Sequence, residues 1–254
     1  DFTELTTAIT AHAPFDTAHI CVPNHLHYKT ALKLAEHTKI VFVEKPGVET
    51  INHWRLLTNL NKSTRFMMTK NNQWRNNIKQ IAENCEASDM IQINWVNKNR
   101  IPGPGTWFTD KSKAFGGVSR DLLPHLMSIM MSVNKNSYQD FKVKQYHTEQ
   151  RWNLSDCTGT DYGVVNENGV YDVDDSATME LTDGNKTYIL YANWKTNLHD
   201  DMAIHFYKDG ESHLASIPLG LCPEEAYKEM IKDSLRHLED DMFWNKQLEQ
   251  DLYI

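Results

Sequence analysis

Two kinds of hydrophobic pattern divide the chain. Residues 19–22 and 40–43 are short apolar runs, and the second is apolar at every position (Ile-Val-Phe-Val). A strand that is apolar on both faces is typical of a buried parallel sheet. Between the two runs, from Leu26 onward, apolar residues recur at helical spacing with lysines on the opposite side. The pattern predicts a strand–helix–strand unit over residues 18–46, with a right-handed crossover.

The same pattern continues on both sides of this unit. Residues 1–17 suggest a short helix that leads into the first strand, and Thr50 is a suitable N-cap for a helix to about residue 59. Residues 66–69 read as a further strand, followed by a helix over about 73–86. We therefore expect residues 1–88 to form part of a Rossmann-like parallel sheet.

From residue 89 onward the period is that of half-buried strands. Residues 90–96 alternate between apolar and polar side chains, which indicates a strand with one buried face. Three pairs of Asn or Asp with Gly are strong hairpin signals. Further alternating runs are found at 142–147, 176–181, 187–194 and 203–207. The Asn-Gly and Asp-Gly pairs are at 168–169, 183–184 and 209–210. Two helical segments are expected, one at 118–133 and one after Pro223. Residues 89–254 are predicted to be an open, mainly antiparallel sheet domain with helices, which makes the fold class α/β plus α+β.

Composition excludes several classes of partner. The net charge of −8, without a basic cluster, argues against binding to nucleic acid. No apolar run approaches the length of a membrane span, so no membrane partner is expected. The four cysteines are far apart without a CxxC pair, which predicts reduced thiols in a cytoplasmic protein. No metal site is predicted, because residues 199–201 (His-Asp-Asp) are better explained as a solvated loop.

Polar residues follow two of the predicted strands in the first domain. Pro23-Asn24 and Glu44-Lys45-Pro46 each come directly after an apolar run. In open α/β sheets, ligands bind at the carboxyl ends of the strands. Position alone also allows solvated strand ends, so these residues are candidates for a site and no more.

Two motifs make the interpretation more specific. Residues 23–27 (P-N-H-L-H) and 44–46 (E-K-P) flank the helix, and residues 107–125 begin with Trp, contain a Gly pair and end in Asp-x-x-x-His. In this order, the motifs resemble those of the glucose–fructose oxidoreductase / inositol dehydrogenase (Gfo/Idh/MocA) family. The resemblance implies an NAD(P)-dependent enzyme that transfers a hydride between nicotinamide and a secondary alcohol of a sugar, cyclitol or related polyol.

The resemblance also implies roles for three catalytic candidates. Lys45 would lie beside substrate and nicotinamide, where an ammonium group can hydrogen-bond the reacting hydroxyl and share its proton. The Lys45–Pro46 bond is a candidate for the cis form. Asp121 and His125 are spaced i, i+4 and would share one helix face. His125 is our candidate general base and Asp121 its orienting partner, although this spacing is also common in surface helix pairs.

Further site residues follow from the family pattern. His27 is either a residue of the helix start or part of the site lining, and Trp107 is either core or a wall for a sugar ring. Leu123 and Ser128 stand where the family often has Gly and Asp, which would reshape the pocket. The expected cofactor-binding residues are Pro23, Asn24, His27, Glu44, Lys45 and Pro46, and the expected substrate-binding residues are Asn72, Arg75, Trp107, Asp121 and His125.

One family feature is not found in the sequence. The eleven glycines begin at Gly47, and none forms the Gly-x-Gly-x-x-Gly turn that holds the pyrophosphate of a dinucleotide. We therefore expect an absent N-terminal segment and weak binding of NAD or NADP by the chain as given, which could be inactive. A non-catalytic sugar- or dinucleotide-binding regulator is the alternative function. The resemblance further implies a homodimer or homotetramer that assembles through the open sheet.

Overall fold

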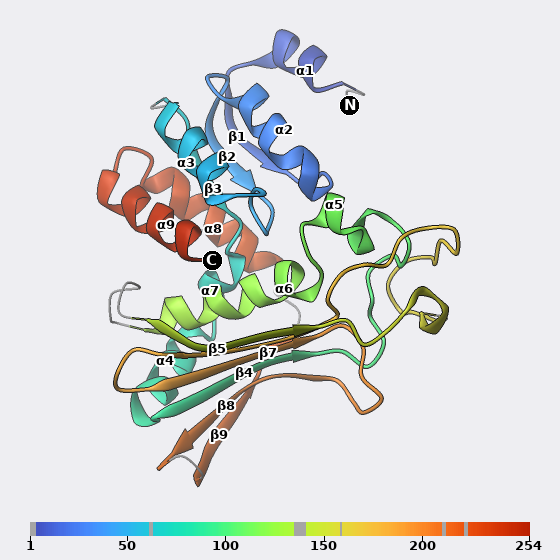
Figure 1. The fold of residues 1–254 in the computed structure, drawn as a ribbon. Coiled ribbons are helices and arrows are strands. Elements are labelled where there is room, and N and C mark those ends of the chain that lie inside the picture. The colour runs from blue at the N-terminus through green and yellow to red at the C-terminus, as the bar shows by residue number, and fades with distance from the viewer. Residues whose placement is uncertain (1–3, 61–62, 135–140, 158, 210–211, 221–222) are drawn as a thin grey trace. The chain divides into compact units, whose positions relative to one another are not determined.

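The computed structural model describes residues 4–60, 63–134, 141–157, 159–209, 212–220 and 223–254. The chain forms two compact units, which are Asp1–Lys70 with Lys228–Ile254, and Asn71–Tyr227 (Figure 1). Both ends of the chain therefore belong to the first unit. These units differ in extent from the predicted domains 1–88 and 89–254. Within the described residues, no helix has the length and apolar character needed to cross a bilayer.

A three-stranded parallel sheet forms the centre of the first unit. The strands, in the order β1-β2-β3, are β1 (Phe15–Ile20), β2 (Thr38–Val43) and β3 (Arg65–Met68). Residues 40–43 of the middle strand are fully buried, which confirms the prediction of a strand covered on both faces. The helices that accompany the sheet are α1 (Leu5–His12), α2 (His27–Leu34), after the short η1 (Asn24–Leu26), and α3 (Ile51–Leu60). The hydroxyl oxygen of Thr50 accepts a hydrogen bond from the backbone N–H of His53 at 3.2 Å, as expected of the N-cap of α3.

Two helices close the chain, α8 (Glu224–Arg236) and α9 (Asp241–Tyr253). The acidic run at residues 239–241 lies at the start of α9. Its central residue, Asp240, is the N-cap, and its carboxylate accepts hydrogen bonds from the backbone N–H groups of Met242 and Phe243. A carboxylate at this position satisfies donors that the helix leaves unpaired.

A buried ion pair joins α9 to the end of β3. The ammonium group of Lys70 donates to the Asp251 carboxylate and to the carbonyl oxygen of Gln247, and both charged side chains are 1% exposed. The second carboxylate oxygen of Asp251 accepts the backbone N–H of Met68 at 3.1 Å. Burial opposes both charges, since it lowers the pKa of Lys70 and raises the pKa of Asp251 to about 6. Each charge therefore depends on the other.

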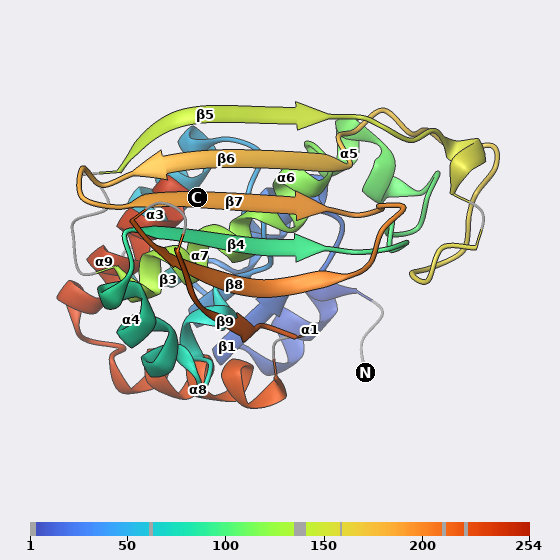
Figure 2. The same cartoon turned by 90° about the horizontal axis from the view of Figure 1, so that it is seen from below.

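A six-stranded sheet forms the centre of the second unit. Figure 2 shows the strands side by side in the order β5-β6-β7-β4-β8-β9. Only the neighbours β4 and β7 run parallel, so the prediction of a mainly antiparallel sheet is confirmed. The strands are β4 (Met90–Val96), β5 (Lys142–Glu149), β6 (Ser176–Thr182), β7 (Thr187–Asn193), β8 (Asp201–Lys208) and β9 (Ser212–Pro218). The sequence analysis did not predict β9, whose residues are mostly exposed at the sheet edge.

The helices of the second unit differ from the prediction at two places. A helix over 73–86 was expected, but α4 (Ile78–Ala87) begins after Asn77 and follows the short η2 (Asn71–Trp74). Asn77 is the N-cap of α4, although its side chain makes no capping hydrogen bond. The expected helix 118–133 is broken at Leu122 into α6 (Val118–Asp121) and α7 (Leu123–Val133). Pro124 causes the break, because it has no N–H for the turn before it.

The three predicted hairpin turns have different outcomes. Asp183-Gly184 joins the antiparallel strands β6 and β7, as expected. Asn168-Gly169 does not form a hairpin, because it lies in the long connection between β5 and β6, where a Cβ on Gly169 would come within 1.8 Å of the Gly105 carbonyl oxygen. Close backbone packing explains that glycine. Asp209 lies between β8 and β9, and its partner Gly210 lies outside the described residues.

We predict that Asp251→Ala lowers the free energy of unfolding of the first unit by about 3 to 5 kcal/mol, because it leaves a buried ammonium group without its partner. Urea denaturation followed by circular dichroism would measure the change. The double variant Lys70→Met/Asp251→Leu should be more stable than Asp251→Ala, since it leaves no buried charge. Equal stability of the two variants would contradict the prediction.

Candidate functional site

A tight turn follows the middle strand of the first unit. The backbone N–H of Glu44 donates to the carbonyl oxygen of Ile20 at 3.1 Å, and the N–H of Gly47 donates to the carbonyl oxygen of Glu44 at 2.9 Å. The Lys45–Pro46 bond is cis, as predicted. Glu44, Lys45 and Pro46 are half-buried. The turn therefore presents the predicted catalytic lysine at the carboxyl edge of the sheet.

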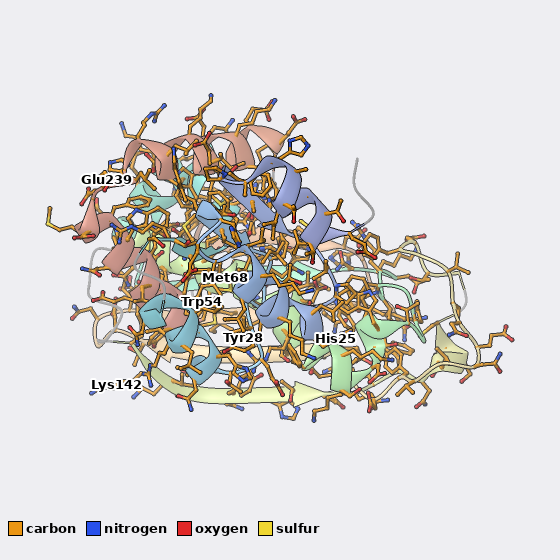
Figure 3. The ribbon with its side chains drawn as sticks, turned by 90° about the horizontal axis from the view of Figure 1, so that it is seen from above. His25, Tyr28, Trp54, Met68, Lys142 and Glu239 are labelled. Carbon is orange, nitrogen blue, oxygen red and sulfur yellow. The ribbon has the colours of Figure 1, made fainter. Side chains whose placement is uncertain are left out.

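Glycine is required at the end of this turn. Gly47 has a φ of 77°, a region in which side chains are disfavoured. An added Cβ would make only ordinary van der Waals contact, at 3.4 Å from the Met68 sulfur and 3.6 Å from the Trp54 ring, so the backbone φ is the reason for glycine. Met68 and Trp54, both labelled in Figure 3, are part of the buried core of the unit. The core thus sets the path of the backbone that follows Lys45.

The His27 side chain contacts the backbone of this turn. Its Nδ1 lies 2.7 Å from the carbonyl oxygen of Gly47 and its Nε2 lies 2.8 Å from the carbonyl oxygen of Val22. The ring is 1% exposed, and burial lowers the pKa of His27 although both carbonyl contacts favour the charged form. Because both ring nitrogens contact the backbone, the geometry favours a residue that positions the strand ends. Pro23 and Asn24 open η1 just before it and are half-buried.

His19 belongs to the same edge and was missed in the sequence. Its Nε2 lies 3.0 Å from a carboxylate oxygen of Glu44 and 3.0 Å from the hydroxyl oxygen of Thr69. These residues come from the ends of all three strands, so His19 links them. The Cys21 thiol lies nearby, and the potential ligand atoms of His19, Cys21 and Glu44 are within 4.8 Å of one another. Among the described residues, this is the group that could hold a metal ion, although the His19 nitrogen already contacts Glu44 and Thr69.

The second unit holds the other predicted catalytic residues. Asp121 ends α6 and His125 lies in the first turn of α7, so the two residues flank the break at Leu122. The indole N–H of Trp194 donates to the Asp121 carboxylate at 2.7 Å. Trp95 stacks on the His125 ring with 5.5 Å between ring centroids and an angle of 25°. Buried aromatic residues from the sheet therefore orient both side chains.

The Gly pair before α6 also has a structural reason. The carboxylate of Asp174 accepts the backbone N–H groups of Gly117 and Ser119 at 3.0 and 2.8 Å. A Cβ on Gly117 would come within 1.7 Å of the Asp174 carbonyl oxygen. Only glycine allows the chain to approach this closely at the start of the helix that carries Asp121.

Asn72 and Arg75 are buried, and each makes hydrogen bonds inside the second unit. The guanidinium of Arg75 donates to the side-chain oxygen of Asn72 at 2.7 Å and to the carbonyl oxygens of Leu219 and Gly220 at 2.5 and 3.0 Å. The amide nitrogen of Asn72 lies 3.1 Å from Nδ1 of His125. The structure thus connects both predicted substrate residues to the catalytic candidate. These contacts favour a supporting role for them.

Trp107 and the residues that differ from the family pattern also have defined places. Trp107 begins η3 (Trp107–Thr109), is half-buried and stacks on Phe108 with ring centroids 3.8 Å apart. Leu123 and Ser128 are buried in α7, and the Ser128 hydroxyl donates to the His125 carbonyl oxygen at 2.9 Å. The remaining short helices are α5 (Lys111–Ala114) and η5 (Leu154–Asp156).

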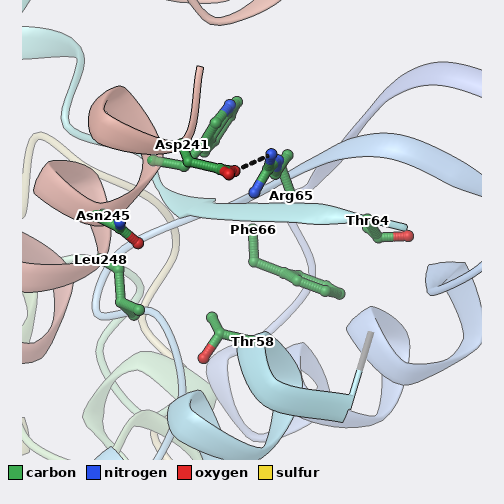
Figure 4. Close-up of a pocket in the computed structure, with 8 residues that line it drawn as sticks. Thr58, Thr64, Arg65, Phe66, Asp241, Asn245 and Leu248 are labelled. Atoms are coloured by element: carbon green, nitrogen blue, oxygen red, sulfur yellow. Dashed lines mark hydrogen bonds and ion pairs between the residues drawn. The ribbon is translucent and has the colours of Figure 1, made fainter. Parts of the chain in front are cut away.

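A cavity of about 360 Å³ in the first unit lies away from the carboxyl edge. Its lining includes Thr64, Arg65 and Phe66 with Asn245 and Leu248 of α9, and Figure 4 shows the Arg65 side chain directed toward Asp241. The Arg65 guanidinium pairs with Asp241 at 2.6 Å, so its charge is balanced within the lining. Because ligands of parallel sheets bind at the opposite edge, this cavity is not the cofactor site we expect.

Residues 1–71 match the model of an oxidoreductase family with an NAD-binding Rossmann fold, GFO_IDH_MocA. The predicted family resemblance is confirmed. The match contains the strand–helix–strand unit, the Glu44-Lys45-Pro46 turn and Asn71. The Gfo/Idh/MocA match thus describes an NAD-binding domain for the part of the chain that carries Lys45.

A curated relative and two solved structures are also similar to this chain. A protein of Amycolatopsis mediterranei named as a UDP-kanosamine synthase oxidoreductase subunit is 27% identical over 119 residues, which are 45% of this chain and 33% of the relative. A levoglucosan dehydrogenase in complex with NADH and levoglucosan has a TM-score of 0.62 at 17% identity, with 82% of this chain and 56% of that chain covered. An oxidoreductase domain protein from Kribbella flavida has a TM-score of 0.69 at 16% identity, with 98% and 78% covered.

These similarities cover only part of the related chains and establish only some properties. The matched parts are less than two thirds of the A. mediterranei relative and of the levoglucosan dehydrogenase chain. At 17% and 16% identity, the solved structures establish a shared fold. They confirm the predicted combination of a Rossmann-like parallel sheet with a second, mainly antiparallel sheet.

We predict that His27→Ala destabilises the first unit by about 1 to 3 kcal/mol, because it removes the hydrogen bond that the neutral ring donates to one of the two backbone carbonyl oxygens it contacts. Thermal denaturation would show the loss as a lower melting temperature. Lys33→Ala, on the exposed face of the same helix, is the matched control and should leave the melting temperature nearly unchanged. An equal, small effect of both substitutions would refute the role of His27.

Proposed function

We propose that this chain is part of an NAD(P)-dependent oxidoreductase that transfers a hydride between nicotinamide and a secondary alcohol of a sugar, cyclitol or related polyol. The observation that carries the proposal is the match of residues 1–71 to an NAD-binding Rossmann domain, together with Lys45 in the turn at its carboxyl edge. Ligands of parallel α/β sheets bind at this edge. The levoglucosan dehydrogenase of similar fold, in complex with NADH and a sugar derivative, supports the substrate class.

Each unit contributes a different part of this function. In the first unit, Pro23, Asn24 and the turn of Glu44, Lys45 and Pro46 would contact the nicotinamide end of the cofactor. The nicotinamide supplies the hydride chemistry, and the residues of the chain bind, orient and move protons. His27 and His19 would keep the strand ends at the distances that this contact needs.

The second unit would handle the substrate. Asp121, held by Trp194, would bind a substrate hydroxyl, and His125, stacked on Trp95, would act on the reacting oxygen. Trp107 is half-buried and could pack against the apolar face of a sugar ring. We also propose assembly as a homodimer or homotetramer.

We predict that Lys45→Ala lowers kcat for polyol oxidation by roughly 10² to 10⁴-fold, the usual range for a lost acid–base group. The dissociation constant for NADH should change much less, because the substituted side chain acts on the reacting oxygen. Steady-state kinetics with NAD and NADP and a panel of polyols would measure the first quantity, and fluorescence titration with NADH and NADPH the second. Lys33→Ala is the matched control.

The protein should be tested as residues 1–254 and with any residues encoded before Asp1. Because the 254 residues contain no Gly-x-Gly-x-x-Gly turn, we expect the shorter protein to bind NADH weakly. Saturable binding with turnover that depends on Lys45 would support the proposal. Absence of nicotinamide binding by both proteins would favour the sugar-binding regulator instead, and turnover unaffected by Lys45→Ala would exclude the role of Lys45.

A further inference from the structure

The part-buried contact between Asn72 and His125 determines which nitrogen of the His125 ring carries the proton. An asparagine amide has an oxygen that only accepts hydrogen bonds and an NH₂ group that only donates them. The direction of the amide therefore dictates the state of any partner. In most proteins this direction is ambiguous, because oxygen and nitrogen have nearly the same shape.

Here Arg75 removes the ambiguity. Its guanidinium has donors and no acceptor, so the Asn72 atom 2.7 Å from its Nε must be the oxygen. Arg75 is itself fixed, since its two terminal nitrogens donate to the carbonyl oxygens of Leu219 and Gly220. Rotation of the amide by 180° would place NH₂ against the guanidinium, two donors facing each other in a buried site.

The NH₂ group of Asn72 consequently faces His125. It lies 3.1 Å from Nδ1 of the ring, and because NH₂ only donates, Nδ1 must offer its lone pair. A neutral imidazole has one N–H, so the proton is on Nε2. A proton on Nδ1 would again bring two donors together. The ring is also held in its plane by stacking on Trp95.

We infer that Asn72, oriented by Arg75, is a positioning residue that keeps neutral His125 in the Nε2–H tautomer, so that His125 donates a hydrogen bond to the substrate oxygen and does not accept its proton. The inference rests on the proposed function for the identity of that oxygen. A donor at this place stabilises a carbonyl or an alkoxide, which are the forms of the substrate around the hydride transfer.

This role leaves the hydroxyl proton to a second group, for which Lys45 is the candidate. In the oxidation, a bound nicotinamide would take the hydride from the substrate carbon, and the side-chain nitrogen of Lys45 would take the hydroxyl proton. In the reduction both transfers reverse, and the Lys45 ammonium group supplies the proton. His125 keeps its Nε2 proton in either direction.

The state of the His125 ring can be measured without turnover. Two-bond ¹H–¹⁵N correlation spectra of protein labelled with ¹⁵N-histidine distinguish the two tautomers, and His125→Gln identifies the signals of His125 among the twelve histidines. We expect Nε2–H in the wild-type chain at neutral pH and above. A wild-type ring with its proton on Nδ1 would overturn the inference.

Asn72→Asp tests the role of Asn72 directly. A carboxylate can accept from Arg75 and from His125 together, so the proton should move to Nδ1 of His125. Asn84→Asp, at a site on α4 outside the network, is the matched control and should leave the His125 signals unchanged. An Nε2–H tautomer that persists in Asn72→Asp would refute the role of Asn72.

Asn72→Leu is a second variant that adds no charge. It removes the donor to Nδ1, so the Nδ1 resonance should shift while Nε2 stays protonated. An unchanged Nδ1 resonance would show that the hydrogen bond does not form and would overturn the inference. If the spectra agree with the inference but no polyol is turned over, the proposed function fails and the tautomer assignment stands.

Discussion

Contacts between buried polar side chains and backbone carbonyl oxygens hold the candidate residues in each unit. In the first unit, the carbonyl oxygens of Val22 and Gly47 face one buried ring, that of His27. In the second unit, those of Leu219 and Gly220 accept from one buried guanidinium, that of Arg75. An unsatisfied buried carbonyl costs about as much as a lost hydrogen bond, so these side chains are as fixed as the backbone they contact.

These fixed side chains in turn orient the groups that are proposed for the chemistry. His27 contacts the backbone at Val22 and at Gly47, and Lys45 lies in the turn that ends at Gly47. Arg75 orients Asn72, and Asn72 orients the proton of His125. The geometry thus supports a different division of work from the sequence-based hypothesis, in which His125 was the general base. A spacing of Asp and His in the sequence cannot reveal a tautomer, because that depends on a residue about fifty positions earlier.

The sequence predicted the elements well where a local rule decides them. The fully apolar run of β2, the alternating β4 and the Thr50 cap need only neighbours in the chain. The prediction failed where a distant contact or a single residue overrides the periodic pattern of apolar residues. Pro124 divides a helix whose apolar spacing is otherwise continuous, and Gly169 packs against Gly105 instead of turning a hairpin. The packing of α9 against the first unit through Lys70 and Asp251 could not be predicted from nearby residues, because nothing in the sequence shows that these two charged side chains are buried.

The site was predicted in the same uneven way. Motif agreement proposed Lys45, Asp121 and His125 as site residues. It could not propose His19, which lies in a strand with no motif of its own and contacts Glu44 and Thr69 only when the sheet forms. Asn72 and Arg75 were expected to bind substrate, yet their polar atoms contact other protein groups. Buried side chains with fixed partners cannot adapt to a ligand, but they can hold a flexible ring in one state. In this chain, hydrogen-bond geometry therefore suggests which residues hold the candidates in place, and sequence motifs suggest the candidates for the chemistry themselves.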